Sequence, residues 1–371
     1  MKDVSQSTFV FASSRPGSVM GRVERRLLRV MAALRARGAT VLLICAPRSP
    51  MAAEAREHGI EVAFYALDRV NFIRTRSRMR KYFKRFGPDV AHSTGVGADL
   101  LVRHAASGVP TRVVNTLLCS DWPRGSSSLF SRLVTRKLDA RSLDGADMLV
   151  CDCARLATRL ADSGVERGHI LVDPPSIDIA EVMAQSGQTI DLPRTSVPLV
   201  GYGGRIEESR GLETLVAASA ILEASGVLAQ VVVAGEGPLL RTLRDDVRSS
   251  HVRYIGWVDS VPAVLRELTV AVFPSTRPGV PTSLLEAAAL GKPIVASRVE
   301  GIDELFEDGR EIRLVPPGDP KALSAAIADL MSDPEEAADM GERARHRTID
   351  EYSSDASIDR HLSLYRELMS R

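Results

Sequence analysis

Short, continuous runs of valine, leucine and isoleucine alternate with helix-length amphipathic segments along most of the chain. The first two runs are TFVFA, from Thr8, and TVLLICA, from Thr40, and between them apolar residues recur at helical spacing from about Gly21 to Arg37. Continuous apolar runs are typical of strands that helices cover on both faces, and strands that alternate with helices build parallel sheets. The sequence therefore predicts an α/β fold.

The alternation is interrupted once and then restarts. Residues 183–198 (MAQSGQTIDLPRTSVP) lack hydrophobic periodicity and hold two prolines, which indicates a linker. We predict a first domain at 1–185, a linker at 186–197, a second domain at 198–350 and a closing helix at 351–371. Each domain is expected to be a Rossmann-like, doubly wound sheet, and the two to face each other across a cleft. Ligands of such sheets bind at the carboxyl ends of the strands.

Composition excludes several classes of protein. The 48 basic and 47 acidic residues leave a net charge of +1, which gives no reason to expect nucleic-acid binding. The sequence has no apolar run long enough to span a membrane, and the apolar stretch near its start is too short for a secretory signal, so we expect a cytoplasmic protein. Cys151 and Cys153 have no second cysteine pair or histidine cluster to complete a metal site, so no metal is expected.

Two arginines flank a glycine turn at the end of the predicted strand PLVGYGG. Gly203 and Gly204 end this strand, Arg205 follows directly, and Arg210 precedes a predicted helix. Guanidinium groups stay charged and offer a planar fork of donors to phosphate oxygens, so this arginine pair suits a diphosphate. The alternative is that both are solvated loop arginines.

The segment AGEGP repeats the strand–glycine–helix construction. Gly235 and Gly237 would let the backbone approach a ligand, and a helix that begins near Pro238 would offer free N–H groups. Taken alone this short motif could also be a plain turn.

The stretch from Phe273 to Ser297 is the most informative. A loop that carries Gly279 leads into the predicted helix TSLLEAAALG, where unpaired amides at Thr282, Ser283 and Leu284 and the helix dipole would form an anion site. Glu286, about one turn further, could accept hydrogen bonds from ribose hydroxyls. The alternative for Glu286 is a surface charge on the helix.

Together these motifs carry a resemblance. The order GR-x4-R-G, AGEGP, V-x-Y-x-GWV, LEAAALGKPIVAS, EGIDEL and PPGDP over residues 198–350 resembles the nucleotide-sugar half of retaining glycosyltransferases of family 4, which have the GT-B fold. The first half is similar more loosely, through GRVER before the first helix, PDVAH at a strand end and PPSID. The closing segment RHLSLYRELM resembles the helix that crosses back to the first domain in that family.

The resemblance implies transfer of a sugar from a nucleotide-sugar donor, expected to be a UDP-sugar, to a lipid-linked or polyhydroxylated acceptor. Anomeric configuration would be retained, and neither a cofactor nor an obligatory metal would be needed. The arginine pair would neutralise the departing diphosphate and Glu286 would hold the ribose. Main chain around Trp257 and Val258 would contact the base, and Gly21 would let a loop of the first domain close over the diphosphate.

The sequence departs from the family pattern at three places. Pro278 stands where the first glutamate of the E-x7-E pair is usual, Leu117 or Leu118 replaces a first-domain histidine, and Ser176 replaces a glycine. We therefore keep as alternatives an idle GT-B protein that binds a nucleotide or glycan as a partner or scaffold, and a GT-B sugar-nucleotide epimerase. His92, at a strand end, could substitute for the missing polar group. The alternative for it is a structural histidine.

A basic segment, Arg69 to Phe86, holds arginines and lysines without one acidic residue, and apolar residues lie between them. An amphipathic helix of this kind could lie on an anionic membrane, which suggests peripheral association with the inner face of the plasma membrane. The alternative is a solvated helix whose arginines face the phosphates of a soluble acceptor. Trp122, in the polar stretch SDWPRGSSS, is expected on the acceptor side.

Overall fold

A computed structural model describes residues 3–14, 20–65, 72–118, 145–192, 195–245 and 252–371. The chain divides into two compact units. Unit 1 combines Met1–Pro174 with Asp355–Arg371, and unit 2 is Pro175–Ser354. Among the described residues, none of the helices combines the length and apolar character that a membrane-spanning segment needs.

Unit 1 is built on a seven-stranded parallel sheet with the order β3-β2-β1-β4-β5-β6-β7. Its strands are β1 (Thr8–Ser13), β2 (Thr40–Cys45), β3 (Glu61–Phe64), β4 (Val90–Thr94), β5 (Arg112–Leu117), β6 (Met148–Cys151) and β7 (Ile170–Val172). Its helices are α1 (Arg22–Ala36), α2 (Met51–Glu57), α3 (Phe72–Phe86), α4 (Val96–Ala106), α6 (Ala154–Asp162) and α15 (Ser354–Ser370).

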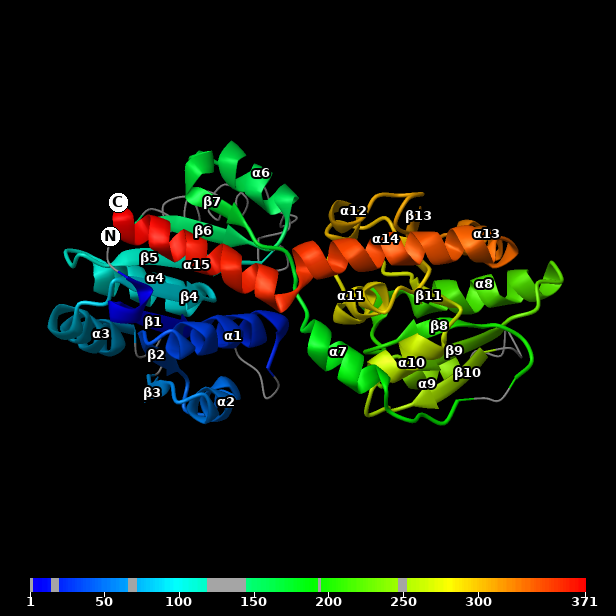
Figure 1. The fold of residues 1–371 in the computed structure, drawn as a ribbon, viewed down its shortest axis with the longest axis horizontal. Helices are drawn as coiled ribbons and strands as arrows, with labels where there is room; N and C mark the ends of the chain where they lie inside the picture. Colours follow the sequence, from blue (N-terminus) through cyan, green and yellow to red (C-terminus); the bar gives the residue numbers. More distant parts are fainter. Residues whose placement is uncertain (1–2, 15–19, 66–71, 119–144, 193–194, 246–251) are drawn as a thin grey trace. The chain divides into compact units, whose positions relative to one another are not determined.

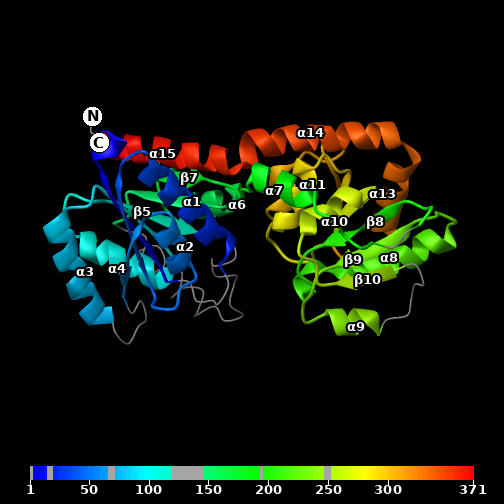
Figure 2. The same ribbon diagram turned by 60° about the horizontal axis from the view of Figure 1, so that its bottom comes forward.

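The two faces of this sheet bury separate apolar clusters, because successive residues of a strand point to opposite faces. Phe9 and Phe11 of β1 pack with residues of α1 and α15. Val10 and Ala12, which alternate with these phenylalanines along β1, pack on the other face with residues of α3 and α4. Burial on both faces explains why the strands read as unbroken apolar runs. Figures 1 and 2 show α15 lying along unit 1.

Unit 2 holds a six-stranded parallel sheet with the order β10-β9-β8-β11-β12-β13. The strands are β8 (Leu199–Gly203), β9 (Gln230–Ala234), β10 (Val252–Gly256), β11 (Val270–Phe273), β12 (Ile294–Ser297) and β13 (Arg313–Val315). The helices are α7 (Ile179–Ser186), α8 (Leu212–Ala224), α9 (Leu240–Arg244), α10 (Val261–Glu267), α11 (Thr282–Ala289), α12 (Ile302–Leu305), α13 (Pro320–Ser332) and α14 (Pro334–Tyr352). The strand order reverses between β8 and β11, which is where doubly wound sheets bind their ligands.

Local sequence accounts for where several of these helices begin. The side chains of Ser260, Asp319 and Asp333 accept hydrogen bonds from the first-turn amides of α10, α13 and α14. Each of these three helices also carries proline in its first turn, where no amide hydrogen is required.

The boundary between the units lies earlier than the sequence indicated, at Pro174/Pro175 instead of residue 185. The difference is α7, which packs in unit 2 against α10 and α11. The hydroxyl of Ser260 donates to the carbonyl oxygen of Gln185 at 2.8 Å, and Val182 is buried in the core of unit 2. Helix α15 packs in unit 1, where the ring of Tyr365 lies 5.4 Å from that of Phe9.

Candidate functional site

The loops that follow β8 and β11 interlock at the switch point of unit 2. Gly211 directly precedes α8 and has φ +61°, and a Cβ placed on it would collide with the carbonyl oxygen of Pro274. The amide of Thr276 donates to the carbonyl oxygen of Ser209 at 3.0 Å. Only glycine meets both demands at position 211, because it tolerates positive φ and leaves room for the neighbouring backbone.

The loop after β9 packs against the same turn. A Cβ on Gly235, which has φ +126°, would collide with the carbonyl oxygen of Gly204, and one on Gly237 would collide with that of Ile206. The amide of Gly235 donates to the carbonyl oxygen of Gly256 at the end of β10, at 2.7 Å. The turn after β8, the AGEGP segment and the end of β10 are thus in direct backbone contact.

Tyr202 fixes the turn at the end of β8. Its hydroxyl donates to the carbonyl oxygen of Arg205 at 2.9 Å. Burial raises the pKa of Tyr202, so the phenol stays protonated and keeps this bond across the physiological range. A Cβ on Gly204 would lie 2.9 Å from this hydroxyl and 3.1 Å from Oγ of Ser283, which places the start of α11 directly beside the turn.

The arginine pair brackets one carboxylate. Nη2 of Arg210 lies 3.1 Å from Oε1 of Glu207, and Nε of Arg205 lies 3.4 Å from Oε2 of the same residue. The side chain of Arg205 is 75% exposed, whereas that of Arg210 is 23% exposed. The hydroxyl of Ser209 donates to Oε1 of Glu207 at 2.8 Å. Both predicted phosphate-binding cations therefore point toward one place, and sequence reasoning missed the acid between them.

The start of α11 differs in part from the expected anion site. The amide of Leu284 donates to the carbonyl oxygen of Pro281 at 3.1 Å, so the expectation of a free amide there is wrong. Its side chain is fully buried in the core of unit 2. Thr282 and Glu286 are half-buried and Ser283 is buried. The helix start offers the end of its dipole beside Gly204, with fewer free donors than the sequence indicated.

The remaining predicted donor-site residues of unit 2 lie on neighbouring loops. Trp257 follows β10, is 69% exposed, and donates from Nε1 to Oδ1 of Asp259 at 3.2 Å. Val258 is half-buried beside it. Gly279, in the loop before α11, donates its amide to the carbonyl oxygen of Glu300 at 2.9 Å, which ties that loop to the loop between β12 and α12. An exposed indole at a strand end is a surface on which a planar base could stack.

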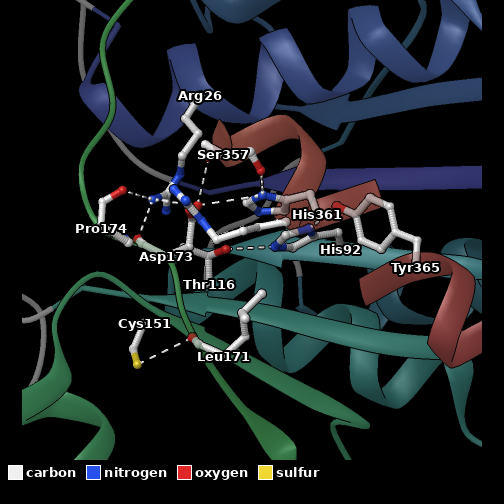
Figure 3. Close-up of polar contacts among 11 residues, drawn as sticks. Arg26, His92, Thr116, Cys151, Leu171, Asp173, Pro174, Ser357, His361 and Tyr365 are labelled. Atoms are coloured by element: carbon white, nitrogen blue, oxygen red, sulfur yellow. Dashed lines mark hydrogen bonds and ion pairs between the residues drawn. The ribbon is translucent and has the colours of Figure 1, made fainter. Parts of the chain in front are cut away.

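In unit 1, His92 is a core residue, and the expectation that it faces the substrate is wrong (Figure 3). Its ring is fully buried in β4. Nδ1 lies 2.6 Å from the hydroxyl of Tyr365, and Nε2 lies 2.7 Å from Oγ1 of Thr116. Both ring nitrogens are therefore occupied within unit 1. The histidine follows the alternative that the sequence left open, a structural role.

A buried ionic cluster adjoins His92, and sequence reasoning missed it. Asp173 is fully buried, lies 3.0 Å from Nη1 of Arg26 and accepts a hydrogen bond from Ser357 at 2.9 Å (Figure 3). It also lies 2.8 Å from Nε of Arg360. His361 Nδ1 donates to the carbonyl oxygen of Ser357 at 2.9 Å. Two motifs of the sequence analysis lie at this cluster: GRVER directly precedes Arg26, and RHLSLYRELM contains Arg360 and His361.

Other predicted features of unit 1 lie partly outside the described residues. Gly21 is described as the exposed residue that precedes α1. Trp122 and the stretch from Arg69 to residue 71 lie outside the described residues. Within α3, Met79 and Phe83 are buried, while the exposed face carries Arg74, Arg78, Lys81, Lys84 and Arg85. Among the residues the structure describes, no group of three or more acidic, cysteine or histidine side chains could hold a metal ion.

Comparisons with known proteins identify the domain families that the chain matches. Residues 21–175 match the glycosyl transferase 4-like domain, and residues 197–333 match the glycosyl transferases group 1 domain. One relative is the lipopolysaccharide core biosynthesis glycosyltransferase LpsE of Rhizobium meliloti, which is 30% identical over 220 residues. That match covers 59% of this chain and 64% of LpsE, so the chain spans less than two thirds of that relative.

Solved structures share the fold over nearly the whole chain. A glycosyltransferase from Rickettsia africae superposes with a TM-score of 0.81 at 16% identity, over 98% of this chain and 99% of that one. HepE of Anabaena, in complex with UDP, superposes with a TM-score of 0.79 at 15% identity, over 97% of this chain and 100% of that one. The chain therefore joins a glycosyl transferase 4-like domain to a glycosyl transferases group 1 domain, and it has the GT-B fold of glycosyltransferases.

Proposed function

We propose that the protein is a retaining glycosyltransferase of family 4 that moves a sugar from a UDP-sugar to a hydroxyl-bearing acceptor, without a metal ion. The observation that carries the proposal is the arginine pair, whose guanidiniums converge at the switch point beside the start of α11. HepE, which shares the fold, has been crystallised with UDP and with UDP-glucose.

In the proposed reaction, the bond between the anomeric carbon and the diphosphate oxygen breaks, and negative charge builds on the departing diphosphate. Arg205 and Arg210 stabilise that charge, as does the positive end of the α11 dipole. The acceptor oxygen bonds to the anomeric carbon on the face that the diphosphate leaves, and its proton passes to the leaving phosphate oxygen. No protein base is then required, which fits a site from which His92 is absent.

Donor recognition is assigned to residues around this pair. Glu286, half-buried one turn into α11, accepts hydrogen bonds from the ribose hydroxyls. The main chain at Trp257 and Val258 contacts the base, and the backbone at Gly203, Gly204, Gly235, Gly237 and Gly279 lets the diphosphate approach closely. Gly21, the exposed residue that precedes α1, is likewise assigned to donor binding.

The test is hydrolysis or transfer of UDP-, GDP- and ADP-sugars by the purified protein. We expect Arg205→Ala and Arg210→Ala each to lower turnover by about 100-fold, the usual cost of removing one preorganised charge-stabilising donor. Arg266→Ala is the matched control, because this arginine is 47% exposed at the end of α10 and pairs with Glu267. Equal turnover in all three variants would contradict the proposal.

A catalytically idle protein that binds a nucleotide or glycan is the second candidate function. The observation in its favour is Pro278, half-buried in the loop before α11, where the family pattern has a glutamate that meets the donor sugar. An idle protein would bind UDP in calorimetry and leave every tested UDP-sugar intact. Pro278→Glu would restore the carboxylate of the family pattern. We expect this variant to gain hydrolysis of the UDP-sugar only if the other residues of the site can support catalysis.

The acceptor is proposed to be lipid-linked or polyhydroxylated, and α3 to hold the protein on the anionic inner face of the plasma membrane. Each basic side chain near such a surface contributes about 1 kcal/mol. Phe86, 52% exposed and stacked on Tyr82 at 4.4 Å, adds an apolar contact at the end of the helix. LpsE is described as a lipopolysaccharide core enzyme.

Flotation with vesicles tests this part of the proposal. We expect binding to vesicles that contain phosphatidylserine and none to pure phosphatidylcholine, with loss of binding when Arg78, Lys81 and Lys84 are changed to glutamate. If the protein does not bind anionic vesicles even at low salt, the proposed membrane association is wrong. The alternative would then be that α3 faces a soluble acceptor.

A further inference from the structure

The carboxylate of Glu207 lies between the two guanidiniums that the proposed function assigns to the diphosphate. We propose that Glu207 is a positioning residue that stands in for the diphosphate in the free protein and exchanges with it on binding and release. This inference rests on the proposed function, because it concerns the same arginine pair.

The contacts of Glu207 fit an exchangeable partner. Its two oxygens are divided between the arginines, Oε1 toward Nη2 of Arg210 at 3.1 Å and Oε2 toward Nε of Arg205 at 3.4 Å. Arg205 is mostly exposed, so this contact is screened by solvent and weak. A ligand oxygen can therefore take Arg205 from Glu207 at small cost.

Glu207 also has a partner that does not depend on the arginines. The hydroxyl of Ser209 donates to its Oε1 at 2.8 Å, so the carboxylate keeps a donor when the guanidiniums turn to phosphate. Glu207 can therefore stay beside the bound diphosphate and pair with the arginines again when the ligand dissociates.

The charges of Glu207 and the two arginines predict how this carboxylate affects diphosphate binding. Arg205, Arg210 and Glu207 together carry a charge of +1, and without the carboxylate the two guanidiniums would repel each other. When a diphosphate binds, the carboxylate becomes a nearby like charge and weakens the hold on the nucleotide. Loss of this acid should therefore tighten nucleoside diphosphate binding, mainly by slowing dissociation.

The alternative role for Glu207 is purely structural, as a brace that orients Arg210. That role predicts the opposite sign, because loss of a brace would misplace the guanidinium and weaken diphosphate binding. The direction of the change in affinity therefore separates the two roles.

The experiment compares Glu207→Gln with Glu208→Gln. The second is a matched control, because Glu208 is 79% exposed in the same loop and pairs with Arg277 instead. Dissociation constants are measured by calorimetry for UDP, GDP, ADP and uridine at one fixed salt concentration, and dissociation rates by stopped flow. We expect Glu207→Gln to bind the preferred nucleoside diphosphate about three- to tenfold tighter, since each exposed ion pair changes an equilibrium by a small factor.

Uridine, which lacks the diphosphate, should bind the three proteins equally, and Glu208→Gln should match the wild type for every ligand. In turnover, Glu207→Gln should lower KM and also lower kcat, because release of the product diphosphate slows. Weaker or unchanged diphosphate binding by Glu207→Gln would overturn the inference, as would an equal gain in Glu208→Gln. If the wild type binds none of the three nucleoside diphosphates, the proposed function itself fails, and that result is distinct from both.

Discussion

Acid should destabilise unit 1 through two histidines that the fold keeps neutral. His92 and His361 are fully buried, and their ring centroids lie 5.6 Å apart (Figure 3). Burial lowers the pKa of His92 well below its ordinary value of 6.5, and the nearby His361 lowers it further. Burial also lowers the pKa of His361, although the carboxylate of Asp173 opposes that shift.

The sign of the effect follows from proton uptake. Below the unfolded pKa of about 6.5, the unfolded chain binds protons on these rings that the folded chain excludes, so stability is full above that pH and falls as the pH drops. As the pH falls from ~7.5 to ~5.5, one ring that stays neutral in the fold lowers the free energy of unfolding by about 1.4 kcal/mol. Two such rings lower it by at most about 2.7 kcal/mol. Total stabilities of about 5–15 kcal/mol make this loss measurable.

Asp173 does not contribute in this window. Burial alone would raise its pKa, but the charges of Arg26 and Arg360 outweigh burial and lower it below 3.8. Its contribution to the free energy of unfolding is therefore present above pH ~3.8 and is lost only as the pH falls through the lower folded value. The predicted fall in the free energy of unfolding near pH 6 is therefore caused by the histidines.

The assay is urea unfolding followed by circular dichroism at a series of pH values, with hydrogen exchange of peptides from β4 and α15 to report on unit 1. We expect His92→Gln to flatten the slope by about 1.4 kcal/mol over this range, because glutamine can donate and accept but does not titrate there. His346→Gln is the control, since this histidine is 70% exposed. A flat wild-type profile, or equal flattening by the control, would refute the reasoning.

Two further predictions concern the stability of each unit. Asp173→Asn should lower the free energy of unfolding by about 3–5 kcal/mol, because it leaves the buried Arg26 without its counter-charge. Urea unfolding should show a far smaller loss for Asp178→Asn, because asparagine can still cap α7. Gly211→Ala should cost about 1–2 kcal/mol for its positive φ and about 1–3 kcal/mol more for the collision with Pro274. Gly226→Ala, with φ +74° and nothing within 4 Å of the added Cβ, should show only the smaller loss in the same assay, and equal losses would contradict the role given to the interlocked loops.

Much of the fold could be predicted from the sequence, because strands covered on both faces need apolar residues throughout. TFVFA and TVLLICA led directly to β1 and β2, and the restart of the pattern after residue 198 led to the second sheet. The placement of α7 could not be predicted, because its packing in unit 2 depends on contacts between residues far apart in the sequence. One of these is the hydrogen bond from Ser260 to Gln185, 75 residues apart. Periodicity reports which face of a helix is apolar and says nothing about which core receives it.

The candidate site divides in the same way. Glycines and arginines at strand ends could be predicted as loop residues near the switch point, because the end of a strand and a sharp turn are local properties. The burial of His92 could not, since its partner Tyr365 lies 273 residues further along the chain. Nor could the position of Glu207 between the two arginines, because a count of charges in a loop does not say which way each side chain turns.

The same residue type performs two different tasks in the two units, and burial decides which. Arg26 is 6% exposed and faces a fully buried carboxylate, so breaking that pair would strand a charge away from water and cost several kcal/mol. Arg205 is 75% exposed beside Glu207, and water can replace that partner with little loss. A buried ion pair is therefore fixed and serves the fold, whereas an exposed one can exchange its carboxylate for a phosphate. Exchange of this kind is what the diphosphate site that we propose requires, and Arg205 allows it because its side chain is mostly exposed.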